Sequence, residues 1–195
     1  MAEAYSMISV PRKNNNAGRA SGKKSYIIIF RWDDIKTFAK DEKGVKVTAF
    51  EFQEGKKPVA VYATDSTINI YHTAEGDDDA RGFIHHVDFD HPGSEVEWDE
   101  FVNNNVNENL GAIVMNCKGD DCKIAGTPCT PLKMSTAEGQ DNNEANKTTI
   151  NLVSSLRGDT LGRIAKSLIP VTDNEEINAI LGLPSAAESS QGGGV

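Results

Sequence analysis

The stretch RGFIHHVDFDHPG, residues 81–93, places three histidines and two aspartates close together. Two interpretations compete, a metal site and a β-strand with one solvated face. Alternate residues of a strand point to opposite faces, so a mainly apolar face would hold Phe83, His85, Val87, Phe89 and His91. The polar face would hold Ile84, His86, Asp88 and Asp90. This alternation predicts a strand.

The metal interpretation has a specific weakness. His86 and Asp88 would put an imidazole and a carboxylate on one face, as in half of a two-histidine, one-carboxylate iron site. The further histidine of such a site would have to follow in the chain, but no histidine follows His91, and His72 precedes the pair. Asp90 is about 13 Å from His86 along a strand and cannot share a metal ion with it. We therefore predict no metal ligands in this stretch.

Other segments extend the strand pattern. Ser25–Phe30 (SYIIIF) and Leu110–Cys117 (LGAIVMNC) are continuously apolar, which is typical of strands buried on both faces. Shorter strands are predicted from the patterns at Val45–Phe52, Pro58–Thr64, Thr67–His72, Cys122–Gly126, Thr148–Leu156 and Arg163–Ile169. In Thr148–Leu156, one face would hold Ile150, Leu152 and Leu156.

Two helices are predicted between and after these strands. Ser94 and Glu97 have the spacing of a capping box, and the helix Glu95–Val106 that follows would bury one face, formed by Trp98, Phe101, Val102 and Val106. Thr172 and Glu175 repeat the signal before a short helix that stops at Gly182. The expected fold is mainly β: a β-sandwich or barrel with one flanking α-helix and extended N- and C-terminal arms.

The chain has 195 residues, which favours one domain. We expect a basic N-terminal arm at residues 1–24, a β-sandwich domain at 25–170, and a short helix with a flexible tail at 171–195. Residues 1–24 lack the apolar core of a secretory signal, and no later run is long enough to span a membrane. The odd number of cysteines argues against a disulfide framework. Their spacing, at Cys117, Cys122 and Cys129, does not fit a zinc site, and we expect buried thiols.

Charge is distributed unevenly along the chain. The arm carries +4, from one acidic residue, Glu3, against five basic ones: Arg12, Lys13, Arg19, Lys23 and Lys24. The total of −9 leaves −13 for the remainder of the chain. Such a body repels phosphate, which argues against sequence-specific nucleic-acid binding, although solubility alone would explain the acidity equally well.

Signals for catalysis and cofactors are lacking in the sequence. The loop Glu75–Gly82 clusters Asp77, Asp78 and Asp79, but without the alternating spacing of a calcium loop, and a solvated loop is the better interpretation. The nucleotide-binding glycine motifs, the zinc-protease motif and the nucleophile-elbow motif are all missing. We predict a protein that is not an enzyme and that uses no cofactor.

The order of elements resembles that of tail tube (major tail) proteins of tailed bacteriophages. The resemblance rests on the run from GSEVEWDEFVNNNV through LGAIVMNC and KIAGTPCTPLKM to NKTTINLVSSLRG, and covers residues 25–169. It implies hexameric rings of this chain, stacked into a tube with an acidic channel through which DNA passes without specific binding, and contacts with other tail proteins. The arms would reach neighbouring rings, and Asp77–Asp79 would lie between rings or at the lumen. The protein would be made in the host bacterial cytoplasm and would reside in the virion tail.

Assembly also has a physical argument independent of the resemblance. A strand-rich domain must pair or cover its sheet edges, and pairing them between copies is one solution, although a closed monomeric barrel is another. Three alternatives stay open: another virion component such as a head–tail connector, neck ring or capsid-decorating protein; a small β-barrel metalloenzyme using His72, His85, His86 and Asp88; and a binding module with a pocket in the barrel.

Overall fold

The computed structural model describes residues 6–16, 18–118 and 120–185. It confirms the expected class, since strands make up 45% and helices 15% of the structure, with multi-stranded antiparallel sheet and a flanking helix. The strands are β1 (Lys23–Arg31), β2 (Ile35–Lys40), β3 (Val47–Phe52), β4 (Val59–Tyr62), β5 (Asn69–Glu75), β6 (Gly82–Pro92), β7 (Leu110–Asn116), β8 (Asp121–Ala125), β9 (Leu132–Asp141), β10 (Asn146–Ser154) and β11 (Gly162–Ala165). The helices are α1 (Val96–Asn105) and α2 (Glu175–Leu181), with 3-10 turns at Trp32–Asp34, Asp65–Thr67 and Lys166–Leu168.

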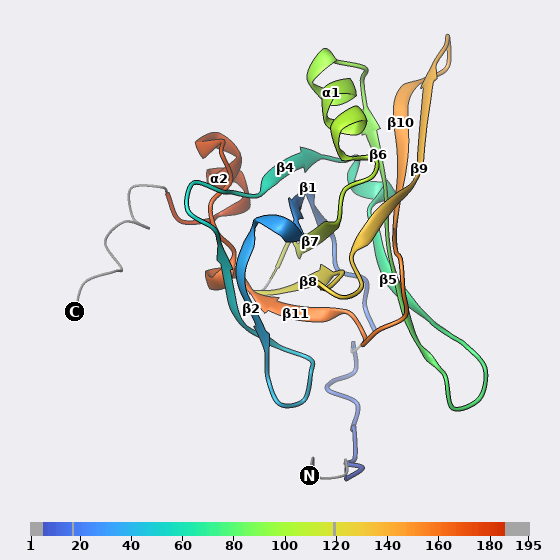
Figure 1. Cartoon of the computed structure of the whole chain (residues 1–195), viewed down its shortest axis with the longest axis vertical. Helices are drawn as coiled ribbons and strands as arrows, with labels where there is room; N and C mark the ends of the chain where they lie inside the picture. Colours follow the sequence, from blue (N-terminus) through green and yellow to red (C-terminus); the bar gives the residue numbers. More distant parts are fainter. Residues whose placement is uncertain (1–5, 17, 119, 186–195) are drawn as a thin grey trace.

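The nine strands of the larger sheet form two packed layers (Figure 1). One layer, the outer sheet, has the order β5–β6–β10–β9. The other, the central sheet, contains β4, β1, β7, β8 and β11 in that order. The layers connect where Leu110 of β7 pairs with Leu132 of β9. Strand pairing therefore joins the two layers at one register position, on one side of the sandwich.

The central sheet is buried on both faces because β1 and β7 contain continuous apolar runs, Ile27–Phe30 and Leu110–Met115. Toward the outer sheet, Ile27 and Ile29 pack with Val87 and Leu152 in one core. Toward the opposite side, Ile28 packs with a second core that includes Val47, Phe50, Ile164 and Leu181. The continuous apolar runs predicted such two-sided burial.

A third layer covers the far face of the central sheet. The β2–β3 hairpin and α2 lie there, opposite the outer sheet (Figure 1). The sequence did not predict β2, whose segment IKTFAK alternates only weakly, nor β9, whose segment LKMSTAEGQD is mostly polar. Both strands owe their conformation to pairing partners rather than to local pattern.

Helix α1 packs on one end of the sandwich through Trp98, Phe101 and Val102, as predicted. Two details differ from the prediction. The N-cap is Glu95, whose side chain makes no capping hydrogen bond, and Ser94 instead accepts one from Asn146 through its hydroxyl oxygen. Val106 lies beyond the helix and is 41% exposed, so it is not part of the buried face.

The end of the chain differs in similar ways. Asn174 caps α2 by accepting from the Ile177 N–H, whereas Thr172 is buried and bonds Asn178, so the second capping box was wrong. Gly182 ends the helix in the left-handed conformation with φ 66°, as predicted. The strand predicted over Arg163–Ile169 is shorter and turns into a 3-10 helix after Ala165. Residues 186–195, predicted to form a flexible tail, lie outside the described residues.

Two further side-chain predictions were wrong. Leu156 follows β10 rather than belonging to it and is 61% exposed, because Ser154 takes the last inward position of the strand. Of the three cysteines only Cys122 is buried, whereas Cys117 and Cys129 are exposed. Cys117 lies just after β7 and donates to the carbonyl of Lys23.

Candidate assembly surface

The outer sheet has one apolar and one polar face. Val87, Phe89, Ile150 and Leu152 point into the core. Residues between them point away from it, and cross-strand pairing aligns these in rows, since directly opposed residues share a face. One row contains Asn69, Asp88, Asn151 and Thr136, and the next contains Asp90, Thr149 and Glu138. This polar face contains carboxylates and amides and is not a closed pocket.

Side-chain hydrogen bonds organise the polar face. Lys147 Nζ donates to Asp90 Oδ2 at 2.6 Å, and the Thr149 hydroxyl donates to Asp90 Oδ1 at 2.8 Å. Burial of Asp90 opposes its charged form, but these two donors outweigh burial and hold the pKa of the carboxyl below its usual value. Asp90 is therefore a carboxylate at neutral pH.

A second group on this face surrounds Asp88. Asn151 Nδ2 donates to Asp88 Oδ1 at 2.9 Å. Tyr71 stacks on His86 with ring centroids 4.6 Å apart, and partial burial together with the Asp88 carboxylate raises the pKa of the Tyr71 hydroxyl. His86 Nε2 also lies 3.2 Å from the Thr73 hydroxyl. The side chains of the face engage one another, which gives a fixed polar surface.

The two margins of the outer sheet are open. Within the described chain, β5 pairs with β6 alone, and β9 pairs with β10 and, through Leu132 alone, with β7. Most of β9 and all of β5 therefore present backbone donors and acceptors along an unpaired edge. The β9–β10 hairpin also extends past the body of the sandwich, beside α1 (Figure 1).

The residues of the metalloenzyme alternative do not converge. His85 is 1% exposed: its Nδ1 accepts from the Gly126 N–H at 2.9 Å, and its Nε2–H donates to the Asp159 carbonyl at 2.8 Å. Asp88 and His86 point to the opposite face. His72 is the direct cross-strand partner of His85, but its ring lies edge-on to Phe83, and both ring nitrogens of His85 are already bonded to backbone groups. The described residues contain no group of three or more histidine, cysteine, aspartate or glutamate side chains that could hold a metal ion.

The predicted acidic loop joins β5 to β6. Asp77, Asp78 and Asp79 are exposed there, and Asp79 has a φ of 63° at the tip. Asp78 forms an ion pair with Arg81 at 3.7 Å. The loop lies at the end of the sheet away from α1 (Figure 1), so it belongs to the rim of the polar face rather than to its centre.

The predicted basic arm is divided between two environments. Arg12, Lys13 and Arg19 are exposed in the segment that precedes β1, where the Arg12 guanidinium contacts the Asn15 carbonyl. Lys23 and Lys24 instead belong to β1 and bind the body: Lys23 Nζ donates to Asn116 Oδ1 at 2.6 Å, and Lys24 Nζ to the Ile180 carbonyl at 3.0 Å. The extended arm thus ends before Lys23.

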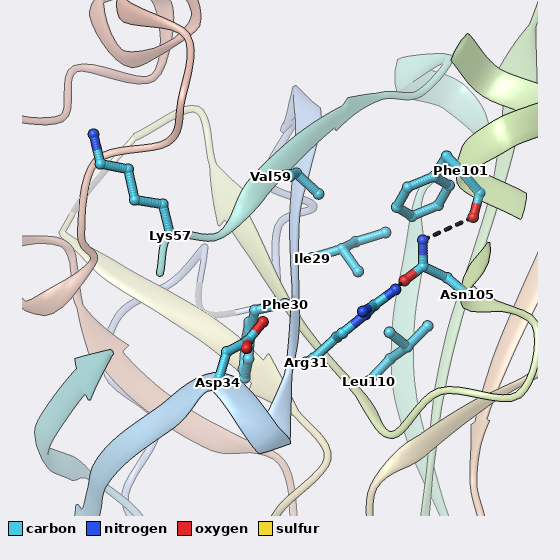
Figure 2. Close-up of a pocket in the computed structure, with 9 residues that line it drawn as sticks. All are labelled: Ile29, Phe30, Arg31, Asp34, Lys57, Val59, Phe101, Asn105 and Leu110. Carbon is cyan, nitrogen blue, oxygen red and sulfur yellow. Dashed lines mark hydrogen bonds between the residues drawn. The ribbon is translucent and has the colours of Figure 1, made fainter. Parts of the chain in front are cut away.

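The described residues form several concave sites. A pocket of about 230 Å³ lies between β1 and α1. Its lining residues, which include Ile29, Arg31, Phe101 and Asn105, are drawn in Figure 2. Arg31 Nε donates to Asn105 Oδ1 at 3.0 Å, and Asn105 Nδ2 donates to the Phe101 carbonyl at 2.7 Å. The first bond fixes the end of α1 against β1 and the second lies within α1, so both are structural. A larger groove crosses β4 between the two helices.

Comparisons with known proteins give no family assignment. No family model matches the chain, and neither a curated protein nor a solved structure matches it. No helix in the described part of the chain combines the length and apolarity needed to cross a membrane.

Sequence reasoning assigned the face of each β6 residue but missed the open edges. Edge status depends on which strands pair, and the β9 segment gave no strand signal of its own. The only local signal was the alternation of apolar and polar residues in Thr148–Leu156. This alternation predicts a strand, and a strand needs a pairing partner on at least one side.

Proposed function

We propose that this chain is a structural protein that assembles with copies of itself, and specifically that it is a tail tube subunit of a tailed bacteriophage. It acts as a building block without catalysis or cofactor. Copies of the chain form rings, which are hexameric if the resemblance to tail tube proteins holds, and the rings stack into a conduit in the virion tail. The chain is made in the host bacterial cytoplasm.

The observation that carries this proposal is the pair of open margins on one polar-faced sheet. Pairing of β9 in one copy with β5 in the next is a head-to-tail contact, and such contacts generate a closed ring when the rotation between copies closes. The apolar faces remain in each subunit core, so the ring would present the polar faces of all subunits toward one side.

The electrostatics of the chain support a conduit for DNA. Asp88, Asp90 and Glu138 lie on the polar face, and the body of the chain is acidic overall. Lys147, also on this face, forms an ion pair with Asp90. Negative charge on this face lowers affinity for phosphate, which lets nucleic acid pass without adhering.

Negative-stain electron microscopy of the purified protein tests the proposal, together with light scattering. Rings or tubes, with a particle mass many times the 21.1 kDa of one chain, are expected. Stacked tubes distinguish a tail tube from a neck or connector, which would stop at single rings. A particle that stays monomeric across protein and salt concentrations contradicts the proposal.

A further inference from the structure

A groove of about 640 Å³ crosses β4 between α1 and α2. Its floor is the strand Val59–Tyr62, one wall contains Trp98 and Phe101, and the other contains Ile177. Figure 1 shows β4 running between the two helices. The floor is incompletely covered, with Val59 36% and Tyr62 42% exposed.

The floor strand is an open edge. Within the described residues β4 pairs with β1 alone. Just past β4, the Ala63 N–H donates to the Ser25 carbonyl at 2.7 Å. Since hydrogen-bonded and non-hydrogen-bonded pairs alternate in an antiparallel ladder, the backbone groups of Ala60 and Tyr62 point away from β1. One of them, the Tyr62 carbonyl, accepts from His91 Nδ1 at 2.9 Å, which leaves the groups of Ala60 and the Tyr62 N–H facing the groove.

The rim of the groove is acidic. Glu95 and Glu97 line it from the α1 side and Asp173 from the α2 side. His91 touches both the Tyr62 carbonyl and Glu95, the latter at 3.6 Å, which places this glutamate at the Tyr62 end of the floor. An occupant with an apolar extended segment followed by positive charge would match this arrangement.

The N-terminal arm has these features in this order. Met7, Ile8 and Val10 are 90%, 68% and 88% exposed, which is unusual for large apolar side chains. Pro11 ends the apolar segment, and Arg12 and Lys13 follow at once. Residues 6–10 have no helix or strand assignment. The hydrogen bonds described for residues 6–16 join arm residues to one another.

We propose that residues 7–10 of the arm of a second copy dock in this groove as an added strand on β4, with Arg12 and Lys13 against Glu95 and Glu97. In a strand, Ile8 and Val10 share a face and would meet one wall of the groove, while Met7 meets the other. The acidic rim fixes the direction, because Arg12 and Lys13 must reach the Tyr62 end, so the added strand runs parallel to β4.

The occupant is a second copy because the arm leaves the body away from the groove. Figure 1 shows the segment before β1 extending beyond the end of the sandwich opposite α1. The docked arm is one interface between subunits of the proposed assembly. It rests on the proposed function only where more than two copies assemble into rings and tubes. Docking of an arm on its own groove, which the chain length permits, is an outcome of the test.

Two measurements test the docking. The first is fluorescence anisotropy of a labelled peptide, SMISVPRK, which spans residues 6–13, titrated with the full chain carrying Ile8→Asp and Val10→Asp so that its own arm does not compete. We expect saturable binding that weakens about tenfold in a receptor that also carries Glu95→Lys and Glu97→Lys. The matched control Glu100→Lys, on an exposed part of α1 outside the groove, should leave binding unchanged.

A charge swap completes the first measurement. A peptide with Arg12→Glu and Lys13→Glu should bind the unaltered groove about tenfold more weakly and regain affinity for the Glu95→Lys, Glu97→Lys groove. Thermal unfolding verifies that each receptor is folded. Absence of binding, or equal binding by the Glu95→Lys, Glu97→Lys receptor and the Glu100→Lys control, overturns the site.

The second measurement distinguishes docking of an arm on its own subunit from docking on a second copy. A chain with an intact groove and the Ile8→Asp, Val10→Asp arm is mixed with a chain that has an intact arm and the Glu95→Lys, Glu97→Lys groove. Mass photometry should detect a mixed complex that neither chain forms alone, while a chain with Arg19→Glu should associate as the unaltered protein does. Peptide binding without a mixed complex shows that the arm docks on its own body and overturns the second-copy assignment.

These results separate the inference from the proposed function. Tubes that form equally well from the Ile8→Asp, Val10→Asp chain, with no peptide binding, retain the tail tube proposal and overturn the docking. A mixed complex without rings or tubes in any preparation retains the docking and overturns the tail tube.

Discussion

His85 and Gly126 are joined by a buried hydrogen bond, in which the Gly126 N–H donates to Nδ1 of the imidazole at 2.9 Å. The Asp159 carbonyl accepts from the other ring nitrogen at 2.8 Å, and these two partners require the neutral tautomer with its proton on Nε2. One side chain of β6 thereby ties together the turn after β8 and the loop before β11. The histidine-rich stretch thus contains a structural histidine at a buried position.

Replacing His85 with leucine should lower the free energy of unfolding by about 1–3 kcal/mol, because the buried Gly126 N–H loses its acceptor and the carbonyl of the exposed residue Asp159 loses its donor, while the volume is nearly conserved. Urea denaturation at pH 7.5 measures this. The control is His72→Leu, at an exposed position on β5, where a change below about 0.5 kcal/mol is expected. Equal effects of the two substitutions would show that the buried imidazole has no special role.

Stability should also fall with acid through His85. Burial, reinforced by the nearby charges of Lys40 and His72, lowers the pKa of this imidazole, and its hydrogen bond to the Asp159 carbonyl only partly opposes the shift. Since the folded pKa lies below the unfolded value of about 6.5, the unfolded chain binds the proton more readily. The contribution of His85 is therefore fully present above about pH 6.5 and is lost progressively as pH falls below it.

The measurement is the free energy of unfolding between pH 7.5 and 5.5. The unaltered chain should lose stability over this interval, and His85→Gln, which cannot titrate, should lose much of that slope. His86→Gln is the matched control, because its ring lies on the polar face and makes no buried backbone bond. A slope that disappears in His86→Gln and persists in His85→Gln contradicts the assignment.

The sequence predicted the two-sided strands well and the edges poorly. Ser25–Phe30 and Leu110–Cys117 are continuously apolar, and a segment with that pattern can only be buried on both faces. In β9, by contrast, the residues from Ser135 onward are mostly exposed and polar, so nothing local distinguishes the strand from a loop. The capping residues failed for a related reason: Thr172 satisfies the buried Asn178 amide instead of the helix end.

The candidate site was less predictable than the fold. The polar face of β6 follows from alternation, but the network around Asp90 joins residues separated by 57 and 59 positions in the chain. The roles of His85 depend on Gly126 and Asp159, which lie 41 and 74 positions away. Such contacts are set by strand order, which periodicity does not encode.

Lys147→Gln should raise the pKa of the Asp90 carboxyl toward its usual value. Lys147 supplies a donor and a positive charge that favour the carboxylate, and Thr149 would remain as the second donor. Because the folded pKa is depressed, this pair stabilises the fold above about pH 4 and its contribution is lost as pH falls through the folded pKa. The Lys147 side chain is 39% exposed, so the loss at neutral pH should stay below about 1 kcal/mol.

NMR titration of the Asp90 carboxyl measures the shift directly. Lys133→Gln is the matched control: it removes the same charge from the same sheet, but Lys133 Nζ binds the Asn107 carbonyl rather than a carboxylate. An Asp90 titration curve that is identical in Lys147→Gln and the unaltered chain would exclude the ion pair as the cause.

The packing of helix α1 on the sandwich should depend on one hydrogen bond within an otherwise apolar interface. Trp98 is 5% exposed, stacks on His91 with centroids 4.0 Å apart, and donates from Nε1 to the Thr148 hydroxyl at 2.9 Å. Thr148→Val removes the acceptor and should cost about 1–3 kcal/mol. In a Trp98→Phe background the same substitution should cost less, because the indole donor is already gone, and a double-mutant cycle should give a coupling above about 0.5 kcal/mol. Additive effects would mean that the hydrogen bond contributes nothing measurable.

Gly111 should resist substitution because Phe30 lies over it. The two residues are direct cross-strand partners of β7 and β1, and a Cβ atom at Gly111 would come within 2.3 Å of the Phe30 ring. Phe30 is only 4% exposed and its ring packs edge-on against Phe50, so it has little room to move. Gly111→Ala should therefore cost about 1–3 kcal/mol, and much less in a Phe30→Leu background, where the ring is absent.

Gly139→Ala on β9 is the control. Its Cβ would meet nothing closer than the Thr148 hydroxyl at 4.0 Å, so this substitution should be neutral or slightly stabilising. Urea denaturation of the four chains of this cycle decides it: a cost of Gly111→Ala that is unchanged by Phe30→Leu would place the strain elsewhere than in this cross-strand pair.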